Sequence, residues 1–190
     1  MTGEAAPGPD IRPVGPGSWA DFSRLFTTRG APSTCWCMIF RSQPDGTRPL
    51  VRADREAEMH RRISGGEPVG LLAYDAGRPA GWCSAAPRST YRGVGGAAYP
   101  DTDGDEVWSL VCFFVLRSAR GQGLQHALLA AAVEHAAGAG AKVLEAYPVL
   151  PDSPSYRFGG LVPFFEAAGF THRGTAGSRR QVMSLPLPGS

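Results

Sequence analysis

The chain has almost no lysine and little net charge. Its 19 Lys and Arg residues stand against 17 Asp and Glu residues, a formal net charge of +2, and Lys142 is the only lysine. A surface that binds nucleic acid through its phosphates needs a much larger excess of positive charge. The composition therefore argues against a nucleic-acid-binding protein, whereas a preference for arginine suits a small phosphate-bearing ligand.

Long apolar runs are also missing. No segment approaches the roughly 20 apolar residues of a membrane-spanning helix, and the first residues, MTGEAAPGP, lack the basic and apolar regions of a secretory leader. We therefore predict a cytoplasmic protein without membrane contact. At 190 residues and 43% hydrophobic content, one full core is expected. We predict a flexible tail over residues 1–10 and a single domain over residues 11–188.

Cysteines are few, and their spacing fits neither a disulfide framework nor a zinc site. Cys35 and Cys37 are one residue apart, whereas the cysteines of structural zinc pairs are usually two to four residues apart. Their aromatic segment, residues 34–41, is predicted to be extended, with both thiols on one face. The remaining thiols are Cys83 and Cys112, and the four histidines form no ligand pattern. We expect reduced cysteines and no metal.

Two common phosphate-binding motifs are absent as well. Residues 107–124 run from an apolar strand through the turn Arg120-Gly-Gln-Gly123 into an alanine-rich helix. The dinucleotide motif fails because His126 stands where its third glycine belongs, and no Gly-Lys-Ser/Thr sequence occurs. A strand that becomes a helix at such a turn still presents free N–H groups and the positive end of a helix dipole. The segment therefore predicts an anion site, with phosphate as the anion.

The hydrophobic pattern elsewhere predicts an α/β protein in which helices and strands alternate. A short strand is predicted at residues 11–14, and a long loop at residues 87–104. Helices are predicted at residues 19–26, 53–64, 124–137 and 161–168. In addition to the strand that precedes the turn at Arg120, strands are predicted at residues 69–74, 80–86 and 142–149. The pattern contains no internal repeat that would suggest a second domain.

The strand, turn and helix resemble the acetyl-CoA site of the Gcn5-related N-acetyltransferases, the GNAT superfamily. The loop of that family reads Q/R-x-x-G-x-G/A; Arg120 and Gly123 match it, and Gln125 replaces the last small residue. A second resemblance is the segment Phe165-Glu-Ala-Ala-Gly-Phe170, which matches a family helix that reads Tyr-Glu-x-x-Gly-Phe. Phe165 thus stands where many members have a tyrosine that is thought to protonate the departing CoA thiolate.

The resemblance implies a single GNAT domain with a mixed central sheet, splayed between its fourth and fifth strands and flanked by helices. It also implies acetyl-CoA as the acyl donor and no metal. The pantetheine arm would lie along Phe113, Phe114 and Val115, and Phe165 would face the donor. The pyrophosphate would bind the turn formed by Arg120, Gly121, Gln122, Gly123, Leu124 and Gln125.

The acid and the base of the reaction are open. An ammonium acceptor, with a pKa near ~10, must lose a proton before it can attack. In several family members the base lies six residues before the position of Val115, where this chain has Ser109, which could hold a water that relays the proton to Glu106. Glu145, a carboxylate in an otherwise apolar strand, is the other candidate. Tyr156 or Tyr147 could supply the missing acid, and water is the third possible source of the proton.

These observations predict an N-acetyltransferase that moves an acetyl group from acetyl-CoA to the amine of a small molecule by direct attack. An antibiotic-like or biosynthetic amine, an amino acid and a protein terminus remain open as acceptors, and a homodimer is left open. One alternative keeps the fold with a larger acyl-CoA or an aminoacyl-tRNA as donor, the only case in which nucleic acid would be a partner. Another is a non-catalytic acyl-CoA-binding module.

Overall fold

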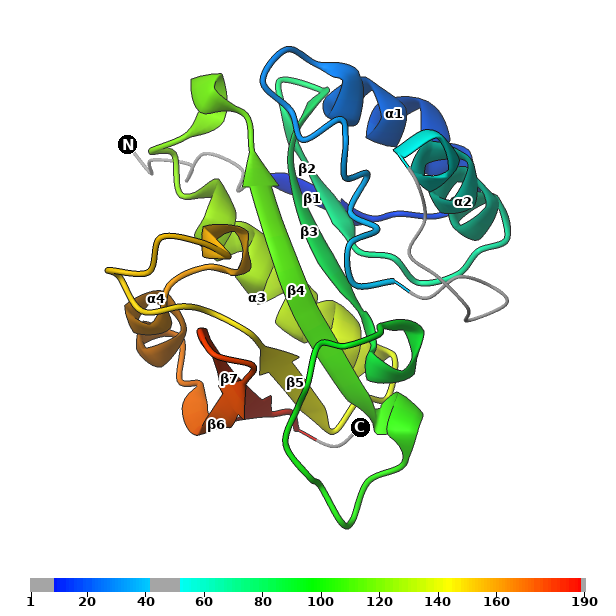
Figure 1. The fold of residues 1–190 in the computed structure, drawn as a ribbon. Coiled ribbons are helices and arrows are strands. Elements are labelled where there is room, and N and C mark those ends of the chain that lie inside the picture. The colour runs from blue at the N-terminus through cyan, green and yellow to red at the C-terminus, as the bar shows by residue number, and fades with distance from the viewer. Residues whose placement is uncertain (1–8, 42–51, 189–190) are drawn as a thin grey trace, which may run out of the picture.

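The computed structural model describes residues 9–41 and 52–188, which form one seven-stranded sheet with helices on both faces (Figure 1). The strands are β1 (Asp10–Pro13), β2 (Leu71–Asp75), β3 (Arg78–Pro87), β4 (Val107–Val115), β5 (Val143–Ala146), β6 (Thr171–Ala176) and β7 (Arg180–Pro186). The helices are α1 (Trp19–Thr27), α2 (Arg52–Ser64), α3 (Leu124–Gly138) and α4 (Val162–Ala167). Short 3-10 turns are η1 (Pro16–Ser18), η2 (Arg88–Thr90), η3 (Gly104–Glu106), η4 (Arg117–Ala119) and η5 (Arg157–Gly159).

The sheet has the order β1-β2-β3-β4-β5-β7-β6, and its one parallel pair is β4 with β5. These two strands pair only from Val107 opposite Val143 to Leu110 opposite Ala146. Because β5 ends there while β4 continues to Val115, the strands part and leave an edge of β4 open. The prediction of an α/β domain with a mixed sheet that splays between the fourth and fifth strands is confirmed.

Each face of the sheet has its own apolar core. On one face the alanine-rich α3 packs through Leu128, Ala132 and Ala136 against β2, β3 and β4, together with Phe165 of α4. On the other face α1 and α2 pack Phe22, Phe26, Met59 and Ile63 around Trp82 of β3. The helical spacing of Phe22 and Phe26 in α1, and of Leu128 and Ala132 in α3, is evident in the sequence, and it marks the stripe that each of these two helices buries.

Two segments differ from the sequence predictions. Residues 34–41 form consecutive turns rather than a strand, with Trp36 and Cys37 in a left-handed conformation. The prediction that Cys35 and Cys37 share one strand face is therefore wrong. In addition, β6 and β7 form a hairpin around Gly177 (φ 69°), at residues for which the pattern gave no prediction.

The rest of the predicted elements are found with small changes in their ends. No helix in residues 9–41 and 52–188 has the length and apolar character needed to cross a membrane. Within the same residues, no group of three or more His, Cys, Asp and Glu side chains is arranged to hold a metal ion. Most of the predicted tail, residues 1–8, lies outside the described residues.

Candidate functional site

The open edge of β4 presents unpaired backbone groups. Leu116 N donates to Ala80 O of β3 at 2.9 Å, and the N–H groups of an antiparallel strand alternate between its two sides. The N–H groups of Phe113 and Val115 therefore point away from β3, toward the gap left by β5. Val115 O also faces that gap, since it accepts a hydrogen bond from Arg120 Nε at 3.1 Å. A ligand with amide groups can pair with this edge as an added strand would.

The turn after β4 ends at the N-terminus of α3. Gly121 and Gly123 have φ angles of 77° and 76°, the left-handed region that glycine adopts without strain. A Cβ atom at either glycine would meet nothing within 4 Å, so the backbone here faces open space. The first helical bond is Ala127 N to Gly123 O, which leaves the N–H groups of the preceding helical residues free to bind an anion.

The open edge and this turn enclose a cavity of about 870 Å³. Most of the predicted donor-binding residues line it: Phe113, Phe114, Val115, Arg120, Gly121, Gly123, Leu124 and Gln125. Ala119, His126, Arg157 and Phe158 also line it, and the sequence analysis missed them. His126 follows Gln125 on α3 and was accessible to the same reasoning. Arg157 and Phe158 reach the cavity only because η5 packs against β4, which no local pattern indicates.

Two predicted donor-binding residues do not line this cavity. Phe165 is fully buried, and its ring packs in the core with Phe113, Phe164 and Phe170 at centroid distances of 5.1–6.2 Å. Phe165 supports the part of the cavity wall that Phe113 forms. Its ring is buried, so it offers no surface for the predicted contact with the donor. Gln122 points to the other side of the turn, where its Nε2 donates to Ser118 O at 3.4 Å.

A buried polar network lies where β4 and β5 part. The Glu145 carboxylate is fully buried and accepts four hydrogen bonds: from Ala97 N at 2.7 Å, Tyr99 OH at 2.9 Å, Tyr147 OH at 2.7 Å and Arg88 Nη1 at 3.1 Å. Arg88 also forms an ion pair with it. A buried carboxylate is stable only when it is paired and hydrogen-bonded in this way. Glu145 thereby anchors the loop of residues 88–99 to the sheet.

Hydroxyl groups extend this network toward β4. Tyr147 OH and Ser109 Oγ are 2.9 Å apart, and both side chains are buried. Burial and the nearby charge of Glu145 raise the pKa of Tyr147, and burial, first among several causes, raises the pKa of Tyr99 to about 12. Both phenols therefore stay protonated at neutral pH and act as donors to Glu145. Ser109, predicted to hold a water near the base, is instead bonded to Tyr147.

Glu106 lies at the far end of β4 from the cavity. It is nine positions before Val115 in the sequence, which corresponds to about 30 Å along an extended strand. Its carboxylate pairs with Lys142 at 2.9 Å and accepts from Asp103 N at 2.9 Å, and these contacts, led by Lys142, lower its pKa. The predicted relay from Ser109 to Glu106 is therefore not formed; Glu106 ties η3 to the start of β5.

Replacement of Glu106 tests this correction. We expect Glu106→Gln to leave acetyl-CoA affinity and turnover within about twofold of wild type, as for a surface substitution away from the site. Because the pKa of Glu106 is lowered in the folded state, its ion pair favours folding above the pKa of the unfolded carboxyl and is lost as the pH falls. Urea unfolding at pH 7 and pH 3 should therefore show that the free energy of unfolding falls less on acidification in the variant than in wild type. A turnover loss above tenfold would contradict the correction.

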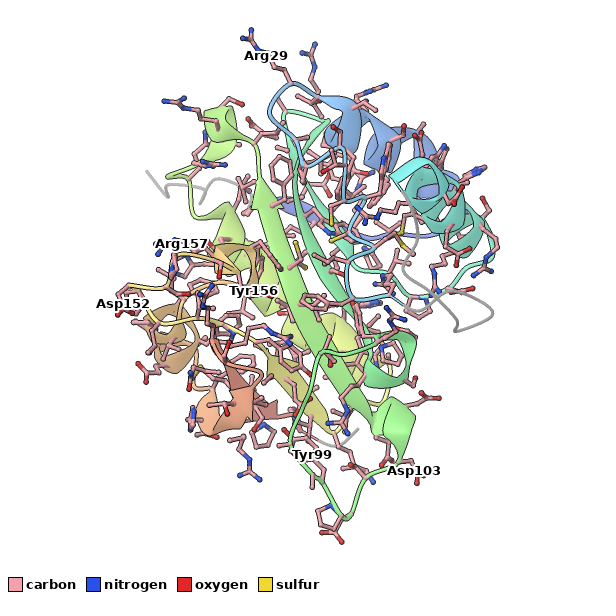
Figure 2. The ribbon with its side chains drawn as sticks, viewed as in Figure 1. Arg29, Tyr99, Asp103, Asp152, Tyr156 and Arg157 are labelled. Atoms are coloured by element: carbon pink, nitrogen blue, oxygen red, sulfur yellow. The ribbon has the colours of Figure 1, made fainter. Side chains whose placement is uncertain are left out.

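Tyr156 lies beside the cavity. It precedes η5 with a φ of 60° and is 39% exposed, and its ring is 6.0 Å from that of Phe158, which lines the cavity. Figure 2 shows Tyr156 and Arg157 near the open part of β4, whereas Asp103 lies at the opposite end of that strand. Of the four predicted catalytic residues, Tyr156 is the one directly followed in the sequence by residues that line the cavity, Arg157 and Phe158.

The comparisons with known proteins agree with this geometry. A model of the Acetyltransferase (GNAT) family matches residues 35–170, whereas no curated protein matches the chain. A protein from Salmonella typhimurium that is described as an acetyltransferase with its cofactor acetyl-CoA is 18% identical, with a TM-score of 0.55 over 97% of this chain and 96% of that one.

Two further solved structures share the fold. A GNAT superfamily phosphinothricin acetyltransferase from Sinorhizobium meliloti, in complex with acetyl-CoA, is 16% identical, with a TM-score of 0.53 over 94% of this chain and 88% of that one. A protein from Corynebacterium glutamicum described as histone acetyltransferase HPA2 and related acetyltransferase is 20% identical, with a TM-score of 0.57 over 96% and 98%. The family match covers most of the chain, which therefore belongs to the GNAT family of acetyltransferases.

Proposed function

We propose that the protein is an N-acetyltransferase that binds acetyl-CoA in the cavity beside β4 and transfers its acetyl group to a small-molecule amine. The observation that carries the proposal is the cavity itself. It joins the unpaired N–H groups of one strand edge to the free N–H groups of one helix terminus. An extended ligand with amide groups at one end and phosphates at the other matches both halves.

The donor would bind through backbone groups. The pyrophosphate would accept hydrogen bonds from N–H groups at the start of α3, where the helix dipole favours negative charge, and the exposed Arg120 adds a positive charge. The amides of the pantetheine arm would pair with Phe113 and Val115. Gln125, half-buried in the cavity wall, would add a side-chain amide where the family has a small residue.

The reaction would be a direct attack. The neutral amine attacks the thioester carbonyl carbon, a C–N bond forms, the C–S bond breaks, and the CoA thiolate takes up a proton. Tyr156 is the proposed donor of that proton, because its residue is 39% exposed and its ring lies next to Phe158, which lines the cavity. Glu145 has four hydrogen-bond donors already, so we assign it the positioning of the neighbouring loop rather than the role of base.

Loss of the Tyr156 hydroxyl tests the proposed acid. Tyr156→Phe should lower kcat roughly 100-fold, the lower range of general acid catalysis, while acetyl-CoA affinity stays within about twofold. Steady-state release of CoA measures both parameters. Tyr74→Phe is the matched control, since Tyr74 donates its hydroxyl to Asp21 of α1 and does not line the cavity beside β4, so this variant should keep wild-type kcat. If Tyr156→Phe also keeps it, the proton comes from water instead.

A panel of acceptors tests the function itself. Purified protein is mixed with acetyl-CoA and with amines grouped as amino acids, polyamines, aminoglycosides and peptides, and the free CoA thiol is measured with a chromogenic disulfide. Thiol release that depends on a small amine supports the proposal. Tight binding of acetyl-CoA without release for any amine would favour a non-catalytic module. Release only with longer acyl-CoA donors, or salt-sensitive binding of charged tRNA, would favour another donor.

A further inference from the structure

The side chain of Arg180 lies among aromatic rings. Arg180 is the first residue of β7 and forms an isolated backbone bridge with Val149, three residues beyond the end of β5. Its guanidinium carbon lies 4.9 Å from the ring centroid of Phe40, 5.7 Å from that of Tyr156 and 5.9 Å from that of Tyr147. Aromatic rings attract a cation at such distances. The rings therefore help to hold this positive charge in one place.

Two backbone carbonyls orient the same guanidinium. Arg180 Nη1 donates to Val94 O at 2.9 Å, and Arg180 Nη2 donates to Gly93 O at 3.2 Å. Both carbonyls belong to the loop of residues 88–99, which Glu145 anchors. A guanidinium has five N–H groups in one plane, and these two bonds use two of them. The other three have no hydrogen-bond partner in the described residues, so they are available to a ligand.

No acidic side chain balances this charge. In the part of the chain that the structure describes, no carboxylate forms an ion pair with Arg180. Arg12, on the edge strand β1, also lies over a tyrosine ring, 4.8 Å from the centroid of Tyr74, but it pairs with Asp10 at 2.6 Å. Arg180 is half-buried, and burial lowers the pKa of its guanidinium. A partly buried charge favours a counter-charge, which an anionic ligand would supply.

Neighbouring arginines add to the positive charge. Arg157 donates to two backbone carbonyls and Arg179 donates to Ser155 Oγ at 2.8 Å, all neutral groups. Within residues 9–41 and 52–188, neither arginine forms an ion pair. Asp152 is the one acidic residue between β5 and α4, and Figure 2 shows it at the outer edge of the molecule, away from Tyr156. The surroundings of Arg180 therefore favour an anion.

The rings around Arg180 connect it to the proposed donor site. Phe158 lines the cavity beside β4, and its ring centroid is 6.0 Å from that of Tyr156 and 6.2 Å from that of Phe40. Phe40 and Phe158 are half-buried and Tyr156 is exposed, so a small molecule can reach these rings from solvent. A molecule that lies along them can approach the donor at one end and Arg180 at the other.

We propose that Arg180 binds the carboxylate of the acceptor, and that the acceptor is therefore an amino acid, an amine that also carries a carboxylate. A guanidinium can pair with a carboxylate through two parallel N–H···O bonds, which would hold the acceptor with its amine toward the thioester. This inference rests on the proposed acetyl transfer and specifies its substrate class. The phosphates of CoA are the competing anion, and the experiments below separate the two.

Matched acceptors test the substrate class. The protein and acetyl-CoA are mixed with glycine, leucine, phenylalanine or glutamine, or with the carboxamide of each, and the free CoA thiol is measured. The carboxamide keeps the amine and the side chain but lacks the negative charge. Its amine is also less basic, so more of it is neutral and ready to attack, and basicity alone would favour the carboxamide. We expect kcat/KM to be at least roughly tenfold higher for the preferred amino acid than for its carboxamide, the effect of one charge-assisted hydrogen bond. Equal values, or higher values for every carboxamide, would overturn the proposal.

Variants assign the carboxylate preference to Arg180. Arg180→Met should raise KM for the preferred amino acid at least roughly tenfold, while KM for its carboxamide and Kd for acetyl-CoA stay within about twofold. Arg180→Lys keeps the charge but loses the planar fork, so its KM should lie between the two. Arg12→Met, which removes the arginine paired with Asp10, should behave like wild type. Circular dichroism confirms that each variant is folded. Equal losses for the amino acid and the carboxamide would make Arg180 a contact that only holds the loop, and a loss of acetyl-CoA affinity would assign it to the CoA phosphates. Either result would overturn the proposal.

A binding measurement distinguishes a failure of this inference from a failure of the proposed function. If no amine releases CoA, the proposed acetyl transfer is wrong. The same amino acids are then titrated by calorimetry into wild-type protein and Arg180→Met, each saturated with CoA. Binding to wild type that Arg180→Met weakens at least roughly tenfold would support Arg180 as a carboxylate site. No binding to wild type, or equal binding to both proteins, would overturn the inference.

Discussion

Gly123→Trp is expected to lower acetyl-CoA affinity at least roughly 100-fold. Gly123 lines the cavity, and a side chain built on it meets no protein atom within 4 Å, so the indole would occupy space proposed for the pyrophosphate. The loss of two charge-assisted hydrogen bonds, each worth about 1.5–3 kcal/mol, corresponds to at least a hundredfold change in Kd. Isothermal titration with acetyl-CoA measures the effect directly.

A matched control separates ligand exclusion from backbone strain. Gly140 follows the other end of α3, with a φ of 85° and open space around its Cβ position, so Gly140→Trp imposes a similar left-handed strain. The 15 residues of α3 put about 22 Å between the two helix ends. Gly140→Trp should therefore bind acetyl-CoA like wild type. Equal affinity losses in both variants, or none in Gly123→Trp, would contradict the placement of the donor.

Glu145→Ala is expected to cost about 3 kcal/mol of unfolding free energy, which is the usual effect of breaking a buried ion pair from one side. The substitution leaves the guanidinium of Arg88, the hydroxyls of Tyr99 and Tyr147, and Ala97 N without their common acceptor. Urea unfolding measures the loss, and the melting temperature should fall by roughly 10 °C for a chain of this size.

Two further variants show whether the loss of stability in Glu145→Ala comes from the broken ion pair. Glu166→Ala changes an exposed carboxylate on α4 and should alter stability by no more than about 0.5 kcal/mol. The double variant Glu145→Leu with Arg88→Leu should lose less free energy of unfolding than the two single variants lose in sum, because neither charge is then left unpaired. A Glu145→Ala protein with wild-type stability but no turnover would make Glu145 the catalytic base rather than an anchor.

The donor turn could be predicted from sequence because its chemistry is local. Arg120, Gly121 and Gly123 lie in one short segment between an apolar strand and an apolar helix, and their backbone groups do the proposed binding whatever surrounds them. The resemblance of the same segment to the GNAT family also predicted the splayed sheet. Eight of the residues named from this reasoning line one cavity in the structure.

Three of the four partners of Glu145 could not be predicted, since they come from a loop about 50 residues earlier in the chain; the fourth, Tyr147, is only two residues away. Arg88, Ala97 and Tyr99 meet the carboxylate only when β3, β4 and β5 have assembled. The glycines and prolines of that segment predict only a long loop at residues 87–104, and they give no sign of the anchor. Similarly, the aromatic and cysteine-rich composition of residues 34–41 predicts an extended segment, but this segment forms turns that pack Trp36 and Cys37 against Trp82.

Amide hydrogen exchange with and without acetyl-CoA tests the central claim most directly. If the donor binds between the open edge of β4 and the start of α3, saturating acetyl-CoA should slow exchange at Phe113 and Val115 and at Leu124, Gln125 and His126. Peptides from α1, β2 and the β6–β7 hairpin should exchange as before. Protection confined to other segments, or no change at saturating acetyl-CoA, would contradict a donor site in this cavity.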